Sequence, residues 1–142
     1  MSIYLETSCL LKLLLDEPGA ERVAALLQGE TRIAVSALTR LESLNVLQGM
    51  KAGGELTEGR HRRAVAGLAA LLKSGPFHSV PLPGDALDEA LRQVTKGSAY
   101  CRTLDRLHLG AMAALHFRRL VTNDAQQALA ARALGLEVLG PA

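Results

Sequence analysis

The chain has 142 residues, of which 49% are hydrophobic and 3% aromatic, and its formal net charge is +2. This length and hydrophobic content predict one globular domain with a sizeable core, and they exclude a disordered chain. The net charge is too small to indicate a nucleic-acid partner, and the scarcity of aromatic rings excludes a surface built for stacking on bases.

Short apolar runs rich in β-branched residues alternate along the chain with longer segments of helical periodicity. The predicted strands are Ile3–Leu5, Ile33–Val35, Phe77–Val80, Leu120–Thr122 and Val138–Leu139. The predicted helices cover residues 8–16, 18–28, 37–51, 57–73, 84–96, 104–117 and 124–134. Strands that alternate with helices predict a single α/β domain over residues 1–142, with a short, mostly parallel sheet of four to five strands flanked by helices.

The cell compartment and the kind of metal site are constrained by what the sequence lacks. No apolar run is long enough to span a bilayer, and no basic cluster precedes the first apolar segment, so we expect a cytoplasmic protein without membrane attachment. The two cysteines, Cys9 and Cys101, cannot form a four-cysteine zinc site, and the four histidines show no H-E-x-x-H spacing. Any bound metal would therefore have oxygen ligands, which favours Mg²⁺ or Mn²⁺.

Two acidic residues follow predicted strands at the point where each strand ends. Glu6 comes directly after the first strand. Asp124 follows the fourth strand, from which Asn123 separates it. In open α/β sheets, ligands bind beyond the carboxyl ends of the strands, so both carboxylates are candidates for a site. Each also has a structural explanation, because acids at helix starts favour the helix dipole and Asp124 with Gln127 fits a capping box.

Glu42 is less easily explained by capping, because it lies within a predicted helix. Leu38, Leu41, Asn45 and Val46 recur around it at helical spacing, which predicts that this stripe faces the core. A carboxylate on such a stripe is costly unless it binds a metal or pairs with a cation. The sequence leaves two alternatives open: a pocket acid, or a buried ion pair with an arginine or lysine.

The helix predicted over residues 104–117 is apolar nearly all round, which indicates that it is buried. Asp105 lies in its first turn, where it is favourable for the helix dipole and would also reach a site on a well-packed support. His108 follows one turn later. We expect it to be a buried, hydrogen-bonded histidine rather than a catalytic base, because no matched acid adjoins it in the sequence.

Other common catalytic motifs are absent from the sequence. Ser8 and Cys9 lie outside any G-x-S-x-G elbow, and no glycine-rich phosphate-binding loop follows a strand. What remains is a set of acids that would repel one another without a cation. Such metal-bound carboxylates serve phosphodiester cleavage, in which the ion activates water and stabilises the scissile phosphate.

Four segments resemble the motifs of PIN-domain ribonucleases, in the order in which that family has them. IYLETSCLLKLLLDE resembles the first motif, with Glu6 as its acid, and SALTRLES resembles the second, with Glu42. RTLDRLHLGAMA resembles the third, with Asp105, and RLVTNDAQQALAARALGLEVL resembles the fourth, with Asp124. The four segments spread over nearly the whole chain. Its length and the third motif resemble the VapC-like toxins of type II toxin–antitoxin systems.

This resemblance implies a three-layer α/β/α fold and a Mg²⁺- or Mn²⁺-dependent endoribonuclease that acts as a toxin. It also implies a homodimer, an RNA substrate and a cognate antitoxin that inserts a segment near the acidic pocket. By this resemblance, Glu6 and Asp105 are the principal metal ligands, and Glu42 and Asp124 complete the catalytic pocket and bind the metal directly or through metal-bound water.

The sequence departs from the family pattern at its first acid, which is normally aspartate and is Glu6 here. The longer arm keeps the charge but moves the carboxylate, and Mg²⁺ tolerates misplaced ligands poorly. The alternative function is therefore a catalytically weakened binding module that pairs with an antitoxin and with RNA. A receiver-type signalling domain is excluded, because the third predicted strand is not followed by a phosphorylatable aspartate.

Overall fold

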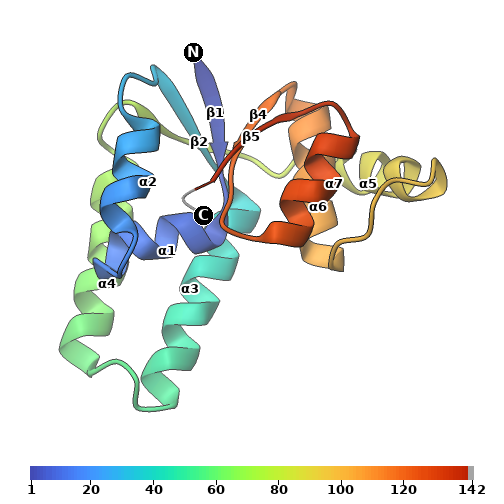
Figure 1. The fold of residues 1–142 in the computed structure, drawn as a ribbon. Helices are drawn as coiled ribbons and strands as arrows, with labels where there is room; N and C mark the ends of the chain where they lie inside the picture. Colours follow the sequence, from blue (N-terminus) through green and yellow to red (C-terminus); the bar gives the residue numbers. More distant parts are fainter. Residues whose placement is uncertain (141–142) are drawn as a thin grey trace.

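The computed structural model describes residues 1–140 and has three layers, with helices on both faces of one central sheet (Figure 1). Its strands are parallel and lie in the order β3-β2-β1-β4-β5. They are β1 (Ser2–Leu5), β2 (Arg32–Ser36), β3 (Phe77–Val80), β4 (Arg119–Val121) and β5 (Glu137–Leu139). The predicted three-layer α/β/α architecture is confirmed, and the sheet contains all five predicted strands.

The helices divide between the two faces of the sheet. In Figure 1, the helices of the first half of the chain lie on one side, and those of the second half lie on the other. The first group is α1 (Thr7–Leu15), α2 (Ala20–Leu27), α3 (Ala37–Ala52) and α4 (Glu58–Leu71). The second is α5 (Ala86–Thr95), α6 (Thr103–Leu115) and α7 (Ala125–Ala133). Among residues 1–140, no helix is long and apolar enough to cross a membrane.

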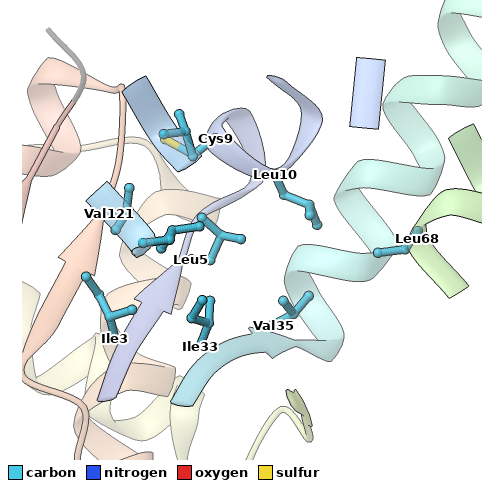
Figure 2. Packing of buried hydrophobic residues seen from close by; sticks show 10 residues of the cluster. Ile3, Leu5, Cys9, Leu10, Ile33, Val35, Leu68 and Val121 are labelled. Carbon is cyan, nitrogen blue, oxygen red and sulfur yellow. The ribbon is translucent and has the colours of Figure 1, made fainter. Parts of the chain in front are cut away.

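The core follows from the alternation of side chains along the two central strands. Ile3 and Leu5 of β1 point to the face covered by α1, α2 and α4, where they pack with Ile33 and Val35 of β2 (Figure 2). Tyr4 points to the opposite face and packs against α6 and α7. Because neighbouring strand residues face opposite ways, a central strand buried on both faces reads as an unbroken apolar run. Tyr4 is therefore as fully buried as its neighbours.

The predicted apolar stripe of α3 is wrong in part. Leu38 is buried as expected, but Leu41 is 66% exposed, and Asn45 and Val46 also face solvent. The buried face runs instead through Leu38, Thr39, Ser43 and Leu47. Two of these buried residues carry hydroxyl groups. Thr39 donates a hydrogen bond to the carbonyl oxygen of Leu5, at the carboxyl end of β1, so α3 packs there through a polar contact. Propensity for burial alone does not reveal such a polar contact.

Helix α6 is buried as predicted, although its first leucine is not. Asp105, His108, Leu109 and Met112 are all buried, whereas Leu104 is 49% exposed. The helix lies between the sheet and α5, which covers it from outside. A helix enclosed in this way gives Asp105 and His108 a rigid support.

Candidate active site

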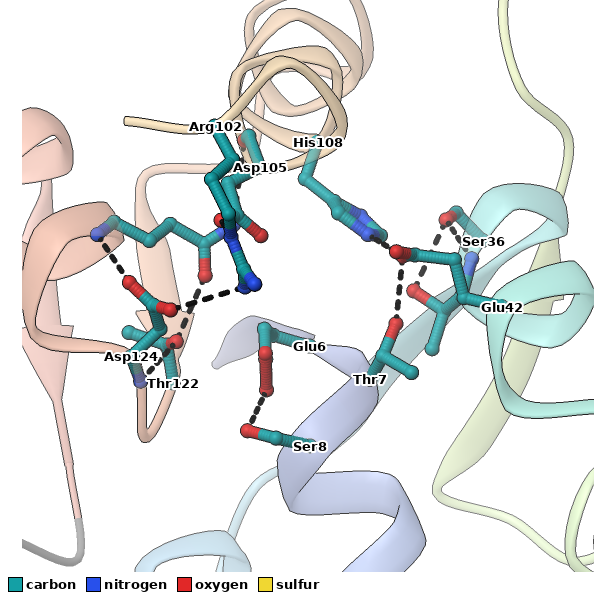
Figure 3. A network of polar contacts seen from close by, with 12 residues as sticks. Glu6, Thr7, Ser8, Ser36, Glu42, Arg102, Asp105, His108, Thr122 and Asp124 are labelled. Carbon is teal, nitrogen blue, oxygen red and sulfur yellow. Dashed lines mark hydrogen bonds and ion pairs between the residues drawn. The ribbon is translucent and has the colours of Figure 1, made fainter. Parts of the chain in front are cut away.

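The pairing of β1 with β4 places Glu6 and Asp124 at the same edge of the sheet, the one formed by the carboxyl ends of the strands. Leu5 is in register with Val121, and the backbone N–H of Glu6 donates a 3.2 Å hydrogen bond to the carbonyl oxygen of Val121. Both strands run parallel and end there, so the residues that follow them leave the sheet side by side. Asp105 enters from α6, and Glu42 enters from α3 (Figure 3).

Glu6 is the N-cap of α1. Its Oε1 accepts a 3.1 Å hydrogen bond from the backbone N–H of Cys9 and another from the hydroxyl of Ser8. The side chain is almost fully buried, and this burial raises its pKa above the ordinary range. No cationic side chain within residues 1–140 forms an ion pair with it. Glu6 is thus a capping residue and, at the same time, a buried carboxylate without a counter-ion.

Asp124 is the N-cap of α7, as predicted, but the side chain of Gln127 does not complete the capping box, because it contacts Thr122 and the carbonyl oxygen of Asp105 instead. Its Oδ1 accepts a 2.7 Å hydrogen bond from the backbone N–H of Gln127, and its own N–H donates to the hydroxyl of Thr122. The hydroxyl of Thr122 in turn donates to the side chain of Gln127. These contacts leave Oδ2 free to meet other groups at the edge, because the cap uses only one carboxylate oxygen.

Asp105 and Asp124 share one cation. The Nε of Arg102 donates to Oδ2 of Asp105 at 2.9 Å, and its Nη2 donates to Oδ2 of Asp124 at 3.2 Å (Figure 3). The hydrogen bond and charge of Asp105 raise the pKa of Arg102 further above its ordinary value, with Asp124 and Glu42 adding to the effect. The guanidinium therefore lies in the field of three of the four candidate acids.

Within residues 1–140, Glu42 forms no ion pair with an arginine or a lysine, contrary to the ion-pair alternative. Its Oε1 accepts a 2.9 Å hydrogen bond from the hydroxyl of Thr7 and lies against Nε2 of His108. Burial raises the pKa of Glu42, but the hydrogen bond and charge of His108 outweigh that effect, and the net shift is downward. The ionised carboxylate is the favoured form at this position.

His108 is buried and has a hydrogen-bond partner on each ring nitrogen, as predicted, but one of the two partners is an acid, Glu42, which the sequence did not place beside it. Its Nδ1 lies 2.7 Å from the hydroxyl oxygen of Tyr4, which lies 2.7 Å from Oγ of Ser36. Burial raises the pKa of Tyr4 to about 12, so the phenol is neutral at physiological pH. A continuous polar chain thus runs from β2 through Tyr4 and His108 to Glu42.

Sequence reasoning missed Arg102 and Tyr4. Arg102 lies three residues before Asp105, a spacing that brings the two side chains together at a helix start, and this was the available signal. Tyr4 gave no signal, because a tyrosine in an apolar strand reads as core. Among the polar residues next to the acids, Thr7, Ser8 and Thr122 orient carboxylates or caps.

The four carboxylates suit Mg²⁺ or Mn²⁺ in donor chemistry, since hard cations prefer oxygen ligands. Asp105 and Asp124 already share one cation, the guanidinium of Arg102, and Glu6 is a buried acid with no counter-ion. Their arrangement is not a preformed ligand set, however. Within residues 1–140, no three potential ligand residues converge as a metal site requires. The residues fit the ion in kind, although Arg102 holds Oδ2 of Asp105 and Oδ2 of Asp124 in this arrangement.

Comparison with solved structures shows the same fold in several proteins. VapBC2 from Rickettsia felis, solved bound to a promoter DNA fragment, has a chain with 16% identity and a TM-score of 0.70, covering 99% of this chain and 98% of that one. VapC20 of Mycobacterium tuberculosis, described as a Sarcin-Ricin loop cleaving toxin, has 16% identity and a TM-score of 0.67, covering 94% and 95%. A toxin–antitoxin complex from Klebsiella pneumoniae has 21% identity and a TM-score of 0.62, covering 99% and 98%.

Identities this low show a common fold and nothing finer. No curated protein matches the sequence significantly. The family profile is more specific: the PIN domain matches residues 3–133, which include all four candidate acids, β1 from Ile3 onward, and β2 to β4. By this match, the chain belongs to the PIN-domain family.

Proposed function

We propose that the protein is an endoribonuclease that depends on Mg²⁺ or Mn²⁺ and acts in the cytoplasm as the toxin of a toxin–antitoxin pair. The observation that carries this proposal is the gathering of Glu6, Glu42, Asp105 and Asp124 at one sheet edge, with Asp105 and Asp124 already bridged by a cation. A bound divalent ion would supply charge neutralisation and an activated water at such an edge.

Each acid has its own proposed part in the catalytic pocket. Glu6 and Asp105 would be the principal ligands, because both are buried, Glu6 keeps one carboxylate oxygen outside its hydrogen bonds, and the carboxylate of Asp105 is held by the exposed Arg102. Asp124 would complete the site from the start of α7. Glu42, held by Thr7 and His108, would stay ionised and orient solvent or substrate from the far side.

The proposed partners are an RNA substrate, a cognate antitoxin and a second copy of the chain. The antitoxin is supported by the toxin–antitoxin complexes among the structures of the same fold. A homodimer is supported by the large hydrophobic side chains exposed on α5, the loop after it and α6. These are Leu87, Leu91, Val94, Tyr100 and Leu104. Monomeric proteins seldom expose so many large apolar groups together.

The experiment that tests the activity is cleavage of a panel of structured RNAs by the purified chain, with Mg²⁺, with Mn²⁺ and with a chelator. We expect metal-dependent cleavage that Asp105→Asn abolishes. The matched control is Asp88→Asn, which makes the same change at an exposed position on α5. Cleavage that survives both Asp105→Asn and the chelator would refute the assignment of this edge as the active site.

A second candidate function is an antitoxin- and RNA-binding module that cleaves poorly. Two observations favour it: the carboxylate of Glu6 is committed to capping α1, and Arg102 occupies both Asp105 and Asp124. Both candidates share the same partners and differ only in turnover. Binding of RNA without cleavage, by the wild type and by Glu6→Asp alike, would select the binding module.

A further inference from the structure

Arg102 makes a contact that no other arginine in the described chain makes: it joins two carboxylates of the candidate active site. Nε holds Asp105, which belongs to α6, and Nη2 holds Asp124, which starts α7. The two acids come from separate elements, and a planar guanidinium with donors on several sides is suited to bridge them. Without a cation between them, their like charges would repel.

Two other arginines show how differently a structural arginine is held. Arg119 joins Glu30 and Glu137, and its side chain is only 15% exposed. Arg106 is buried and donates to the side chains of Gln93 and Ser98. The side chain of Arg102, by contrast, is 68% exposed.

Because of this exposure, Arg102 can leave the acids without opening the core. It is also the N-cap residue of α6, yet its side chain caps no backbone group. The two carboxylates are therefore the partners that fix its position. A cation at this edge would compete with Arg102 for the carboxylates, and an anion would compete with the carboxylates for Arg102.

We infer that Arg102 is an internal counter-ion that occupies the acidic site in the metal-free protein and has to be displaced when a divalent cation binds. The inference rests on the proposed function, since it takes Asp105 and Asp124 as part of the cation site. It adds that the protein blocks its own cation site, because the guanidinium of Arg102 is hydrogen-bonded to one oxygen of each acid, Oδ2 of Asp105 and Oδ2 of Asp124.

The inference predicts two effects of opposite sign from one substitution. Removing the guanidinium takes away the competitor, so a divalent cation should bind more tightly. It also leaves the acids unneutralised, so the metal-free protein should unfold more easily. A residue that merely supported the fold would lower stability without improving cation binding, and a residue that helped to hold the cation would weaken its binding.

The experiment compares the full-length wild type with Arg102→Gln, Arg102→Lys and the control Arg92→Gln. Arg92 pairs with Glu89 at the same spacing, is also exposed, and lies on α5 outside the acidic edge, so it reports the effect of losing any surface arginine. Mn²⁺ affinity is measured by titration calorimetry, and stability is measured by denaturant unfolding in a chelator.

We expect Arg102→Gln to bind Mn²⁺ about two- to fivefold more tightly, as for the loss of a competing exposed ion pair, and to unfold at lower denaturant in the chelator. Arg102→Lys keeps the charge but has a compact ammonium in place of the planar guanidinium. Its Mn²⁺ affinity and its stability should therefore lie between those of the wild type and those of Arg102→Gln. Arg92→Gln should bind as the wild type does.

Three results would overturn the inference. Unchanged or weaker Mn²⁺ binding by Arg102→Gln, in a protein that still cleaves RNA, would refute the counter-ion role and leave the proposed function standing. An equal gain in Mn²⁺ affinity for Arg92→Gln would show that the effect comes from the change in net charge and not from the position of Arg102. Absence of Mn²⁺ binding by every variant, together with absence of RNA cleavage, would remove the proposed function as well.

Discussion

The imidazole of His108 and the carboxylate of Glu42 are hydrogen-bonded to each other although 66 residues separate them in the chain. The contact ties α6 to α3 across the edge of the sheet, and Tyr4 anchors it from the central strand. The partner of Glu42 is thus a titratable group. Whether Glu42 behaves as a crowded pocket acid or as half of a pair can be decided from the sign of its effect on stability.

Glu42→Gln should lower the unfolding free energy in a chelator by about 1–2 kcal/mol, because a hydrogen-bonded charge is lost at a partly exposed site. The folded-state pKa of Glu42 lies below its ordinary value of 4.5. Its ionisation therefore adds stability that is present above that value and is lost as the pH falls through the lower, folded-state pKa. Urea unfolding from pH 3 to pH 8 measures this, and a more stable variant at neutral pH would contradict it.

Glu6→Gln tests a contribution to stability that depends on pH in the opposite direction to that of Glu42. Burial raises the folded-state pKa of Glu6 above its ordinary value of 4.5. The stability linked to the protonated form is complete below that value and is lost as the pH rises through the folded-state pKa. The glutamine variant keeps an acceptor for Cys9 and does not ionise.

The variant should therefore gain on the wild type as the pH rises, when both are unfolded in a chelator. Glu21→Gln, at an exposed position on α2, is the matched control. Parallel pH profiles for the wild type and Glu6→Gln would show that the Glu6 carboxylate is not strained by its burial.

Glu6→Asp should increase the rate of metal-dependent RNA cleavage. The shorter side chain still caps α1, since aspartate is among the preferred N-cap residues, and it withdraws the carboxylate by one methylene. Ligand groups need placing to within about 0.5 Å, so a change of this size should matter. Single-turnover cleavage at saturating Mn²⁺ separates the chemical step from binding, and equal rates would show that Glu6 already reaches the productive position.

A divalent ion should stabilise the folded protein. At about 100 times its dissociation constant, an ion that binds only the folded state adds about 2.7 kcal/mol to the unfolding free energy. Asp105→Asn should remove most of that gain, because Asp105 is buried on α6 and is one of the two proposed principal ligands. Thermal unfolding with Mg²⁺, Mn²⁺ and chelator reports the difference. A midpoint that no ion changes in the wild type would argue against a metal site.

Leu91→Glu should convert the proposed homodimer to a monomer. Leu91 is 56% exposed in the middle of the apolar surface on α5, so a carboxylate there costs the single chain little and opposes burial of that surface. Sedimentation or light scattering gives the mass. Leu129→Glu, at an exposed leucine on α7, is the control, and dissociation by both variants would show that the surface is not specific.

The fold was predictable because the signals that define it are local. Runs such as Ile3–Leu5 and Ile33–Val35 are buried on both faces, and their apolar character follows directly from a parallel sheet. Helix ends were predictable to within a few residues, since caps such as Asp124 carry their own sequence signature. The exposed face of α3 was not, because Leu41 and Val46 resemble core residues in every property except position.

The site was predictable as a list of acids and not as a network. Strand ends identify Glu6 and Asp124, but contacts between residues that are far apart in the chain leave no such signal in the sequence. His108 and Glu42 meet only because α3 and α6 approach the same edge, and that approach is decided by packing over the whole sheet. Arg102 was hidden for the same reason, since its second partner, Asp124, lies on another element.

The position of β1 in the sheet has a consequence for the order in which the molecule is assembled. β1 is the first strand of the chain and lies at the centre, between β2, which follows shortly, and β4, which is nearly the whole chain away. Contacts that close such long loops form late and slowly. As the protein is synthesised, β1, β2 and the helices that cover them can pack first. Glu6 and Glu42 are therefore synthesised well before Asp105 and Asp124, and the candidate active site can be completed only after β4 has been made and has paired with β1.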